Sequence, residues 1–374
     1  MKHHEQLWVL VALLILSMSC RDNQNKPENA TTLKETFKDD FLIGTALSID
    51  QINQTDARTD SLIKQQFNAI TAENIMKAEN IHPAWGQFDF DAADKFVAYG
   101  KQNDRYAVGH TLIWHSQLPS FVEAITDADS LRQFMDLHIG AVGQRYASSV
   151  AAWDVVNEAL NEDGSWRESI FYRLLGEDYL VEAFRKAAEV APDAALYYND
   201  YNIEQPQKRA GTIRLIKKLQ EAGVRIDGVG IQGHWHVDKL QLDAIEESIL
   251  AYAELGVKVA ITELDLTVLP NPWDLQGADV NQAFEGGVDM NPYANQLPDS
   301  VNQTLADSYE QLFRLFLKHR DKISRVTFWG VNDGQSWLNN WPIAGRTNYP
   351  LLFDRDNQPK AAFHRVIDIK KNTN

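Results

Sequence analysis

Cysteine and positive charge are both scarce in this chain. Cys20 is the single cysteine among 374 residues, which excludes an internal disulfide and leaves its thiol free for another role. Lysine and arginine number 36 against 52 aspartates and glutamates, giving a formal net charge of −16. A nucleic-acid partner is therefore not expected, because phosphate backbones are bound by clusters of Lys and Arg.

The region before Cys20 contains an apolar run, Leu7–Leu16, of ten residues. Ten residues are too few to span a bilayer as a helix, whereas an apolar run followed by small residues is typical of a secretory signal. Its end at Cys20 resembles a bacterial lipoprotein signal, although the first residues are barely positive and Leu16 lies one place too far from the cysteine. A buried helix with a chance cysteine is the alternative.

From that resemblance we expect residues 1–19 to be a signal peptide and Cys20 to be the acylated first residue of the mature chain. Residues 20–36 are polar and lack periodicity, which indicates a flexible tether. Residues 37–374 are then a single folded domain. The protein is expected to cross the inner membrane and to be anchored at the outer membrane, facing either the surface or the periplasm. Contact with the membrane would occur only through this lipid.

Alternating strand-like and helical segments follow the tether, a pattern typical of βα units and a parallel sheet. Helical stretches such as Tyr179–Ala191 and Gln207–Ala222 lie between the strand-like runs. Eight such runs favour a single (β/α)₈ barrel, a TIM barrel, over a doubly wound sheet. The predicted strands are Phe41–Leu47, Phe67–Thr71, Tyr106–Trp114, Val150–Glu158, Ala195–Asn199, Gly228–Gly233, Val257–Glu263 and Val326–Val331.

Glu158 and Glu263 each come at the outgoing end of a predicted strand, the fourth and the seventh. Carboxyl ends of barrel strands carry the catalytic groups in TIM barrels, so the two side chains are expected to face one cavity. Two carboxylates of this kind are the groups that most glycosidases use to cleave a glycosidic bond. The simpler interpretation, that each glutamate ends a strand and faces solvent, is equally open for either residue alone.

Six motifs, in order, resemble glycoside hydrolase family 10, the endo-β-1,4-xylanases. The resemblance runs from Asp40 to Ile367, nearly the whole mature chain. Its motifs are Glu73–Lys77, Gly109–Gln117, Trp153–Glu158, Gly230–Trp235, Ile261–Asp265 and Phe328–Gly330.

The resemblance implies a retaining mechanism in which Glu158 is the general acid/base and Glu263 is the nucleophile. Two carboxyls about 5 Å apart are not both ionised easily, so one is expected to keep its proton near neutral pH. The resemblance further implies that His234 bonds the nucleophile and is held in turn by Asp265.

Metal binding is the functional alternative for the histidines, because His234 and His236 form a His-x-His pair, and His110 and His115 lie nearby in the predicted barrel. We expect no metal and no other cofactor, since the single cysteine lies in the signal and each imidazole has a different role in a xylanase. His115 and His236 are expected to be structural.

The resemblance also implies a set of sugar contacts. Asn157 would bond the sugar 2-hydroxyl, a contact that strengthens in the transition state, and Gln232 and His110 would complete that subsite. The next sugar on the non-reducing side would meet Asn74 and Lys77, with Glu73 beside them. Without the other motifs, the start of a helix with a surface lysine would be the preferred interpretation of this last segment.

Tryptophan is abundant, with ten residues, and flat indoles can stack on sugar rings. Trp114, Trp329 and Trp337 are the candidates, whereas Trp153 lies in mid-strand and is expected to be core. Trp337 and Gln117 are candidates for specificity, because an indole over the position of a hydroxymethyl group would reject glucans and accept xylose.

The expected partners are xylan and xylo-oligosaccharides, and the protein is expected to be a monomer. A β-1,4-glucanase or mannanase on the same barrel remains an alternative, as does a surface glycan-binding protein without catalysis. Residues 269–298 are rich in Asn, Pro, Gly and Asp, which predicts a long loop after the seventh strand, beside the cleft.

Overall fold

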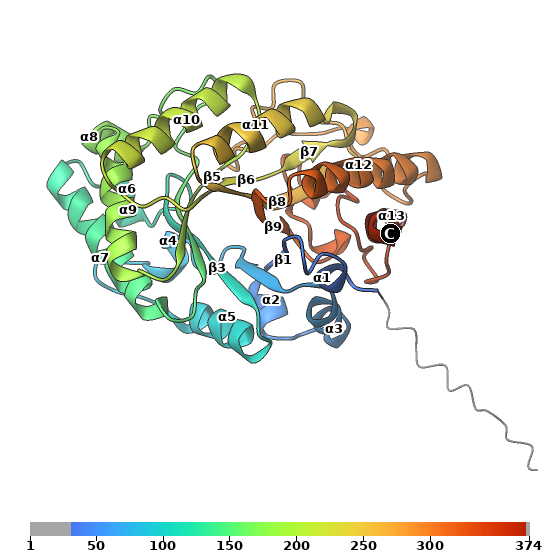
Figure 1. Cartoon of the computed structure of the whole chain (residues 1–374), viewed down its shortest axis with the longest axis horizontal. Helices are drawn as coiled ribbons and strands as arrows, with labels where there is room; N and C mark the ends of the chain where they lie inside the picture. Colours follow the sequence, from blue (N-terminus) through green and yellow to red (C-terminus); the bar gives the residue numbers. More distant parts are fainter. Residues whose placement is uncertain (1–30, 372–374) are drawn as a thin grey trace, which may run out of the picture. The chain divides into compact units, whose positions relative to one another are not determined.

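The computed structural model describes residues 31–371, and in that part of the chain eight parallel strands close into a barrel. A ninth, short strand, β7, pairs with the outer part of β8. Helices surround the strands (Figure 1). The strands are β1 (Leu42–Leu47), β2 (Ala69–Ala72), β3 (Tyr106–Trp114), β4 (Ala152–Asn157), β5 (Ala195–Asp200), β6 (Gly228–Ile231), β7 (His234–His236), β8 (Lys258–Thr267) and β9 (Ile323–Phe328).

Closure of the barrel comes from the pairing of β6 with β8, in register from Gly228 opposite Lys258 to Ile231 opposite Ile261. The other neighbours follow the order β6, β5, β4, β3, β2, β1, β9, β8. All of these pairings are parallel, so the carboxyl ends of the eight strands meet at one mouth. The predicted (β/α)₈ barrel is therefore confirmed, with β8 and β9 as its seventh and eighth strands.

The helices pack their apolar faces against the outside of the barrel. Helix α9, for example, begins after Glu177 and buries Leu180, Phe184 and Ala187. The helices are α1 (Leu33–Thr36), α2 (Ile49–Ile52), α3 (Ala57–Gln66), α4 (Ala78–Ile81), α5 (Asp91–Gln102), α6 (Ser120–Glu123), α7 (Ala128–Tyr146), α8 (Ile170–Leu175), α9 (Asp178–Val190), α10 (Pro206–Glu221), α11 (Leu242–Glu254), α12 (Asp299–Lys318) and α13 (Ala361–Lys371), with 3₁₀ turns η1 (Val237–Lys239), η2 (Val288–Met290), η3 (Asp333–Gln335) and η4 (Trp337–Asn339).

The predicted tether, residues 20–36, extends too far toward the domain. Leu33–Thr36 form α1, whose first turn is capped by the Thr32 side chain, and Leu33 is fully buried. Besides the burial of Leu33 and the helix cap, hydrogen bonds from the Leu33 amide to Gln66 Oε1 at 3.0 Å and from Lys34 Nζ to the Lys64 carbonyl at 2.7 Å attach this segment to the folded domain. Cys20 and the predicted signal lie outside the described residues. Within residues 31–371, no helix is both long enough and apolar enough to span a membrane.

Trp153 on β4 is core, as predicted, and is fully buried. Its indole lies across the backbone of Gly109 on β3, where an added Cβ would come within 2.2 Å of the ring. These two residues are direct neighbours in the β3–β4 register. Glycine at 109 therefore allows the large side chain to lie flat against the adjacent strand.

Register shifts interrupt the sheet close to the mouth of the barrel. They occur between His110 and Ile113 on β3, between Asp154 and Val156 on β4, and between Ile261 and Leu264 on β8. Bulges of this kind change the direction in which the following side chains point. Each shift lies within a few residues of a predicted site residue.

Candidate active site

A cavity of about 110 Å³ lies at the mouth of the barrel, and every predicted catalytic or sugar-contacting residue lines it. Ala278 and Val280, from the long loop after β8, complete its wall. Asp265, predicted as a supporting residue, contacts the cavity through His234. The predicted residues in the wall are Glu73, Asn74, Lys77, His110, Trp114, Gln117, Asn157, Glu158, Gln232, His234, Glu263, Trp329 and Trp337.

Glu158 directly follows β4 and is held by three neutral donors. Its Oε2 accepts from Trp114 Nε1 at 2.9 Å, and its Oε1 accepts from Gln232 Nε2 at 3.0 Å and Asn157 Nδ2 at 3.1 Å. Burial raises the pKa of Glu158 above its ordinary value, although the bonds from Gln232 and Trp114 and the charge of Arg167 oppose the shift. The arrangement favours a carboxyl that keeps its proton and can deliver it.

Glu263 lies within β8 and has a charged donor. His234 Nε2 lies 3.2 Å from Glu263 Oε2, and its Nδ1 lies 2.9 Å from Asp265 Oδ1. Burial alone would lower the pKa of His234, but Asp265 and Glu263 raise it to about 10, so the imidazole is a cation at neutral pH. Burial would likewise raise the pKa of Glu263, but the bond from His234 and the nearby histidine charges bring it below the ordinary value.

Strand β8 does not end at Glu263 as predicted; it continues to Thr267. Glu263 and Asp265 therefore lie two residues apart on one strand and face the same side, as expected from strand geometry. The short strand β7 pairs with this extension, with His234 opposite Asp265. That pairing places the imidazole between the two carboxylates.

Asn199, at the end of β5, belongs to the site and was missed from the sequence. Its Nδ2 lies 2.7 Å from Glu263 Oε1 and 2.9 Å from Asn157 Oδ1, while Thr262 Oγ1 donates to its Oδ1 at 2.6 Å. Asn199 thus connects the residue before Glu158 to Glu263. The available signal was a polar residue at the end of a buried strand, the same signal that identified Glu158.

One side of the cavity is formed by a cluster around Lys77. Its Nζ donates to Asn74 Oδ1 and Gln117 Oε1, both at 2.8 Å, and lies 4.6 Å from the centre of the Trp114 ring. Lys77 is buried, so the alternative of a surface lysine is wrong. Burial lowers the pKa of Lys77, and the carboxylates of Glu263, Glu73 and Glu158 oppose that shift.

The three candidate tryptophans all reach the cavity but differ in their contacts. Trp337 donates from Nε1 to Asp265 Oδ2 at 2.8 Å and stacks on Trp341 with ring centres 4.5 Å apart. Trp329 meets the His110 ring edge to face at 5.4 Å. Trp114 is bonded to Glu158 and has Lys77 over its ring, so part of its surface is already occupied.

Three of the four histidines proposed for the metal alternative, His110, His234 and His236, have protein partners on their ring nitrogens, whereas the two ring nitrogens of His115 have none. His110 Nδ1 lies 3.0 Å from Asp154 Oδ2, and His236 Nε2 lies 3.1 Å from the Leu269 carbonyl. His115 lines a different surface hollow beside Arg167, and burial lowers its pKa to about 3. Between residues 31 and 371, no three histidine, cysteine or carboxylate side chains converge as a metal-binding group.

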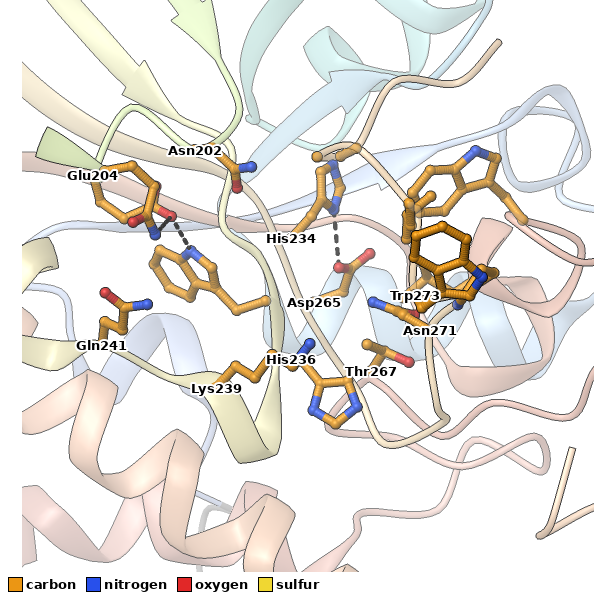
Figure 2. A pocket seen from close by; sticks show the side chains of 18 residues that line it. Asn202, Glu204, His234, His236, Lys239, Gln241, Asp265, Thr267, Asn271 and Trp273 are labelled. Atoms are coloured by element: carbon orange, nitrogen blue, oxygen red, sulfur yellow. Dashed lines mark hydrogen bonds and ion pairs between the residues drawn. The ribbon is translucent and has the colours of Figure 1, made fainter. Parts of the chain in front are cut away.

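A second and larger cavity, of about 300 Å³, adjoins the first and shares His234 and Ala278 with it. Figure 2 shows Asn271 and Trp273 on one side, Glu204 and Gln241 on the other, and His234 with Asp265 between them. Trp273 is 95% exposed although it is a large apolar side chain. The predicted loop at residues 269–298 therefore does lie beside the cleft, and its helical content in the structure is the turn η2.

Arg167 is a second residue that the sequence did not single out. It follows Glu158 by nine residues, and its Nε donates to the backbone carbonyl of Glu158 at 3.0 Å. Its NH1 pairs with Asp279 of the long loop at 3.1 Å. No local pattern marks Arg167 as a partner of Asp279, because the two residues lie 112 positions apart.

Comparison with known proteins places this arrangement in one family. The family model described as glycosyl hydrolase family 10 matches residues 32–369. Endo-1,4-beta-xylanase A of Xylanibacter ruminicola is 40% identical over 349 residues, covering 91% of this chain and 94% of that protein. Beta-1,4-xylanase of Dictyoglomus thermophilum is 39% identical, covering 97% and 99% of the two chains.

A solved structure agrees with the fold as well. A GH10 endoxylanase retrieved from a sugarcane soil metagenome superposes with a TM-score of 0.87 at 45% identity. The match covers 90% of this chain and 99% of that one. The similarity therefore spans the whole barrel and includes the loops that carry the cavity.

Proposed function

The chain belongs to glycosyl hydrolase family 10, and from that premise we propose that it is a retaining endo-β-1,4-xylanase. The observation that carries the proposal is the pair of buried glutamates in one cavity with oppositely shifted pKa values. Cleavage of a glycosidic bond with retention needs one protonated carboxyl for the leaving oxygen and one carboxylate for the anomeric carbon. The xylanases at about 40% identity support xylan as the substrate.

In this mechanism Glu158 donates its proton to the departing sugar oxygen while Glu263 attacks the anomeric carbon. The C–O bond of the substrate breaks, a bond from the carbon to Glu263 Oε forms, and the departing sugar leaves as an alcohol. Glu158, now ionised, takes a proton from a water molecule that attacks the same carbon and frees Glu263. His234 and Asn199 hold Glu263 in position throughout.

Endo action needs sugar-binding surfaces on both sides of the bond that breaks. The cluster of Asn74, Lys77 and Gln117 supplies one side, and the cavity with Trp273 supplies the other. An indole that is almost fully exposed at a cavity rim is well suited to stack on a pyranose ring. A chain that binds across both surfaces is cut internally.

Trp337 supports a preference for xylose over glucose as the bound sugar. Its indole is fixed by the bond to Asp265 and by the stack on Trp341, so it cannot easily move to admit a hydroxymethyl group. A single contact of this kind is worth about 1–3 kcal/mol, so slow hydrolysis of aryl cellobiosides is expected beside fast hydrolysis of aryl xylobiosides.

The proposal is tested by the products from unsubstituted xylan, β-glucan and mannan under matched conditions. We expect a ladder of xylo-oligosaccharides from xylan, with the β-anomer formed first in proton NMR spectra recorded before mutarotation. Faster release from glucan or mannan would assign the enzyme to a different sugar. Initial α-anomers would contradict the retaining mechanism, and the absence of any hydrolysis would favour a glycan-binding protein.

Secretion with a lipid anchor on Cys20 is a separate proposal, supported by the apolar run at Leu7–Leu16 and the small residues before the cysteine. The chain would be anchored at the bacterial outer membrane and would act there as a monomer. Metabolic labelling with a clickable palmitate should mark the wild-type chain and leave Cys20→Ser unmarked. Labelling of both chains would place the acyl group elsewhere. Light scattering of the purified chain reports its oligomeric state.

A further inference from the structure

Part of the long loop after β8 reaches the far side of the barrel mouth. We call residues 277–281 the strap. Asp279 Oδ2 accepts from Arg167 NH1 at 3.1 Å, and Asn281 Oδ1 accepts from Ser116 Oγ at 3.2 Å. Arg167 follows β4 and Ser116 follows β3, which lies opposite β8 in the closed barrel. The strap therefore crosses above the cavity, and its Ala278 and Val280 form part of the cavity wall.

The fit of the strap is close. Gly277 lies against the ring of Tyr201, where an added Cβ would come within 2.4 Å, and its φ of +57° is one that other residues rarely adopt. Asp279 Oδ1 accepts from the backbone and side-chain nitrogens of Asn281, each at 3.0 Å, which orients its Oδ2 toward Arg167. The ion pair is mostly shielded, with the Arg167 side chain 14% exposed and that of Asp279 23% exposed.

Arg167 is the point at which the strap meets the backbone of Glu158. Besides Asp279, its guanidinium donates to the Glu158 carbonyl at 3.0 Å, to Tyr201 OH at 2.6 Å and to the Leu160 carbonyl at 3.3 Å. All three guanidinium nitrogens are therefore occupied. A planar fork of this kind fixes its partners more firmly than a flexible ammonium group can.

Glu158 needs such support because its backbone is in the left-handed region, with φ of +58°. That conformation is unfavourable for a residue with a side chain and persists only when surrounding contacts hold it. The Glu158 amide donates to the Asn199 carbonyl at 2.9 Å, and its carbonyl accepts from Arg167. Loss of the second contact would leave that peptide held by the Ala159 amide alone, which donates to Tyr198 OH at 3.1 Å, and would loosen the backbone that positions the carboxyl.

We propose that Arg167 is a positioning residue for Glu158, and that Asp279 of the strap sets how strongly the Arg167 charge acts on that carboxyl. This inference rests on the proposed function, because it assigns Glu158 the role of the acid. The contact of the strap with Arg167 and the position and protonation of Glu158 are thereby coupled through one guanidinium. Neither Arg167 nor Asp279 contacts the reacting atoms.

The electrostatics agree with the geometry. Burial raises the pKa of Glu158, and the charge of Arg167 is among the groups that lower it. Burial also acts to raise the pKa of Asp279, but the Asn281 amide and Arg167 bring it below the ordinary value, so Asp279 is ionised near neutral pH. Asp279 therefore offsets part of the charge that Glu158 senses.

Two substitutions test the coupling, because they should shift the alkaline limb of the pH profile of kcat/KM in opposite directions. That limb reports deprotonation of the acid in the free enzyme. Arg167→Gln removes a cation, so the limb should move to higher pH. Asp279→Asn leaves the cation unbalanced, so the limb should move to lower pH. Arg173→Gln and Asp274→Asn make the same charge changes nearby without contacting Arg167 or Glu158, and both should leave the limb in place.

A second measurement separates positioning from general damage. Arg167→Gln should lower kcat on xylan by roughly 10- to 100-fold, since small misplacements of a catalytic group have effects of that size. The glycosylation step on 2,4-dinitrophenyl xylobioside should be affected much less, because a good leaving group needs little protonation. Arg167→Lys, which keeps the charge but loses the fork, provides a second variant and should show the same preferential loss on xylan with a smaller shift of the limb.

Equal losses on both substrates with an unmoved limb would overturn the inference and leave Arg167 with a merely structural role. Shifts of the same sign in Arg167→Gln and Asp279→Asn would overturn the coupling. A wild-type enzyme that is inactive on xylan but active on aryl cellobiosides would refute only the proposed substrate, because the two limbs could still be compared on the aryl glycoside.

Discussion

Glu158 and Glu263 are equally buried, each 4% exposed, yet their pKa values move in opposite directions. Glu158 accepts three hydrogen bonds and Glu263 accepts two among the bonds described above. The residue with more donors is therefore the one with the raised pKa. Neither burial nor the number of hydrogen bonds separates the two carboxyls.

The charge of the donor separates them. Every donor to the Glu158 carboxyl is neutral, whereas Glu263 receives one bond from His234, which Asp265 keeps protonated. A cation at hydrogen-bond distance favours an ionised carboxyl more than a neutral amide or indole does. Asp265, which does not line the cavity around the glutamates, thus contributes to the difference between acid and nucleophile through His234.

The largest expected effect comes from removing the carboxyl of Glu263, the glutamate with the charged donor. Glu263→Ala should lower xylan hydrolysis on the order of 10⁴-fold or more, because no group is left to form the glycosyl intermediate. Added azide should restore turnover of an activated aryl xylobioside and give the α-glycosyl azide, with inversion. Azide products with the β-configuration would contradict the assignment. Glu254→Ala, on the exposed end of α11, is the matched control.

Removing the other carboxyl should have a different signature. Glu158→Ala should reduce turnover of xylan by about 10²–10⁴-fold, the usual contribution of general acid–base catalysis. Its glycosylation step on a dinitrophenyl glycoside should persist, and azide should give the β-glycosyl azide, with retention, because azide then attacks the Glu263 intermediate. If all substrates lose activity equally, Glu158 is not the acid.

A third substitution gives Glu263 only neutral donors, as Glu158 has. His234→Gln keeps a neutral donor near Glu263 but removes the cation, so the pKa of Glu263 should rise. The nucleophile must be ionised, so the acid limb of kcat/KM should move to higher pH, with a loss of roughly 10²-fold near neutrality. His364→Gln, at an exposed position on α13, is the control. An acid limb that stays in place would show that the cation does not govern Glu263.

Much of this site could be predicted from the sequence because its parts are encoded locally. A buried run that ends on Glu158 or contains Glu263 predicts a strand and a candidate residue within a few positions, and the order of the six motifs then implies the roles of these residues and of Asp265. The same holds for the eight barrel strands, whose apolar runs are continuous. The short strand β7 was missed because three residues, two of them histidines, carry no apolar pattern.

The contacts that join distant segments could not be predicted. Arg167 and Asp279 are far apart in sequence, and the strap takes its path from side chains on three other loops. Asn199 is similar, since its role depends on the register between β4 and β5 that brings it beside Asn157. Leu33 also shows the limit, because one apolar residue in a polar stretch does not reveal that it is buried.

The smallest expected effect concerns a single neutral donor on the acid side. Trp114→Phe removes the indole bond to Glu158 Oε2 but keeps an aromatic ring beneath Lys77. That bond favours the ionised form, so its loss should raise the pKa of Glu158 and move the alkaline limb slightly to higher pH. Activity should fall only about 5-fold, since one neutral hydrogen bond is worth about 1 kcal/mol.

The matched control is Trp85→Phe, a partly exposed tryptophan that lies outside the cavity wall. Comparison of Trp114→Phe with His234→Gln then measures directly how a neutral and a charged donor differ. If the charge of the donor controls the pKa values of the two glutamates, Trp114→Phe must shift the alkaline limb by less than His234→Gln shifts the acid limb. A shift of the alkaline limb as large as that of the acid limb in His234→Gln would mean that the number of hydrogen bonds matters as much as their charge.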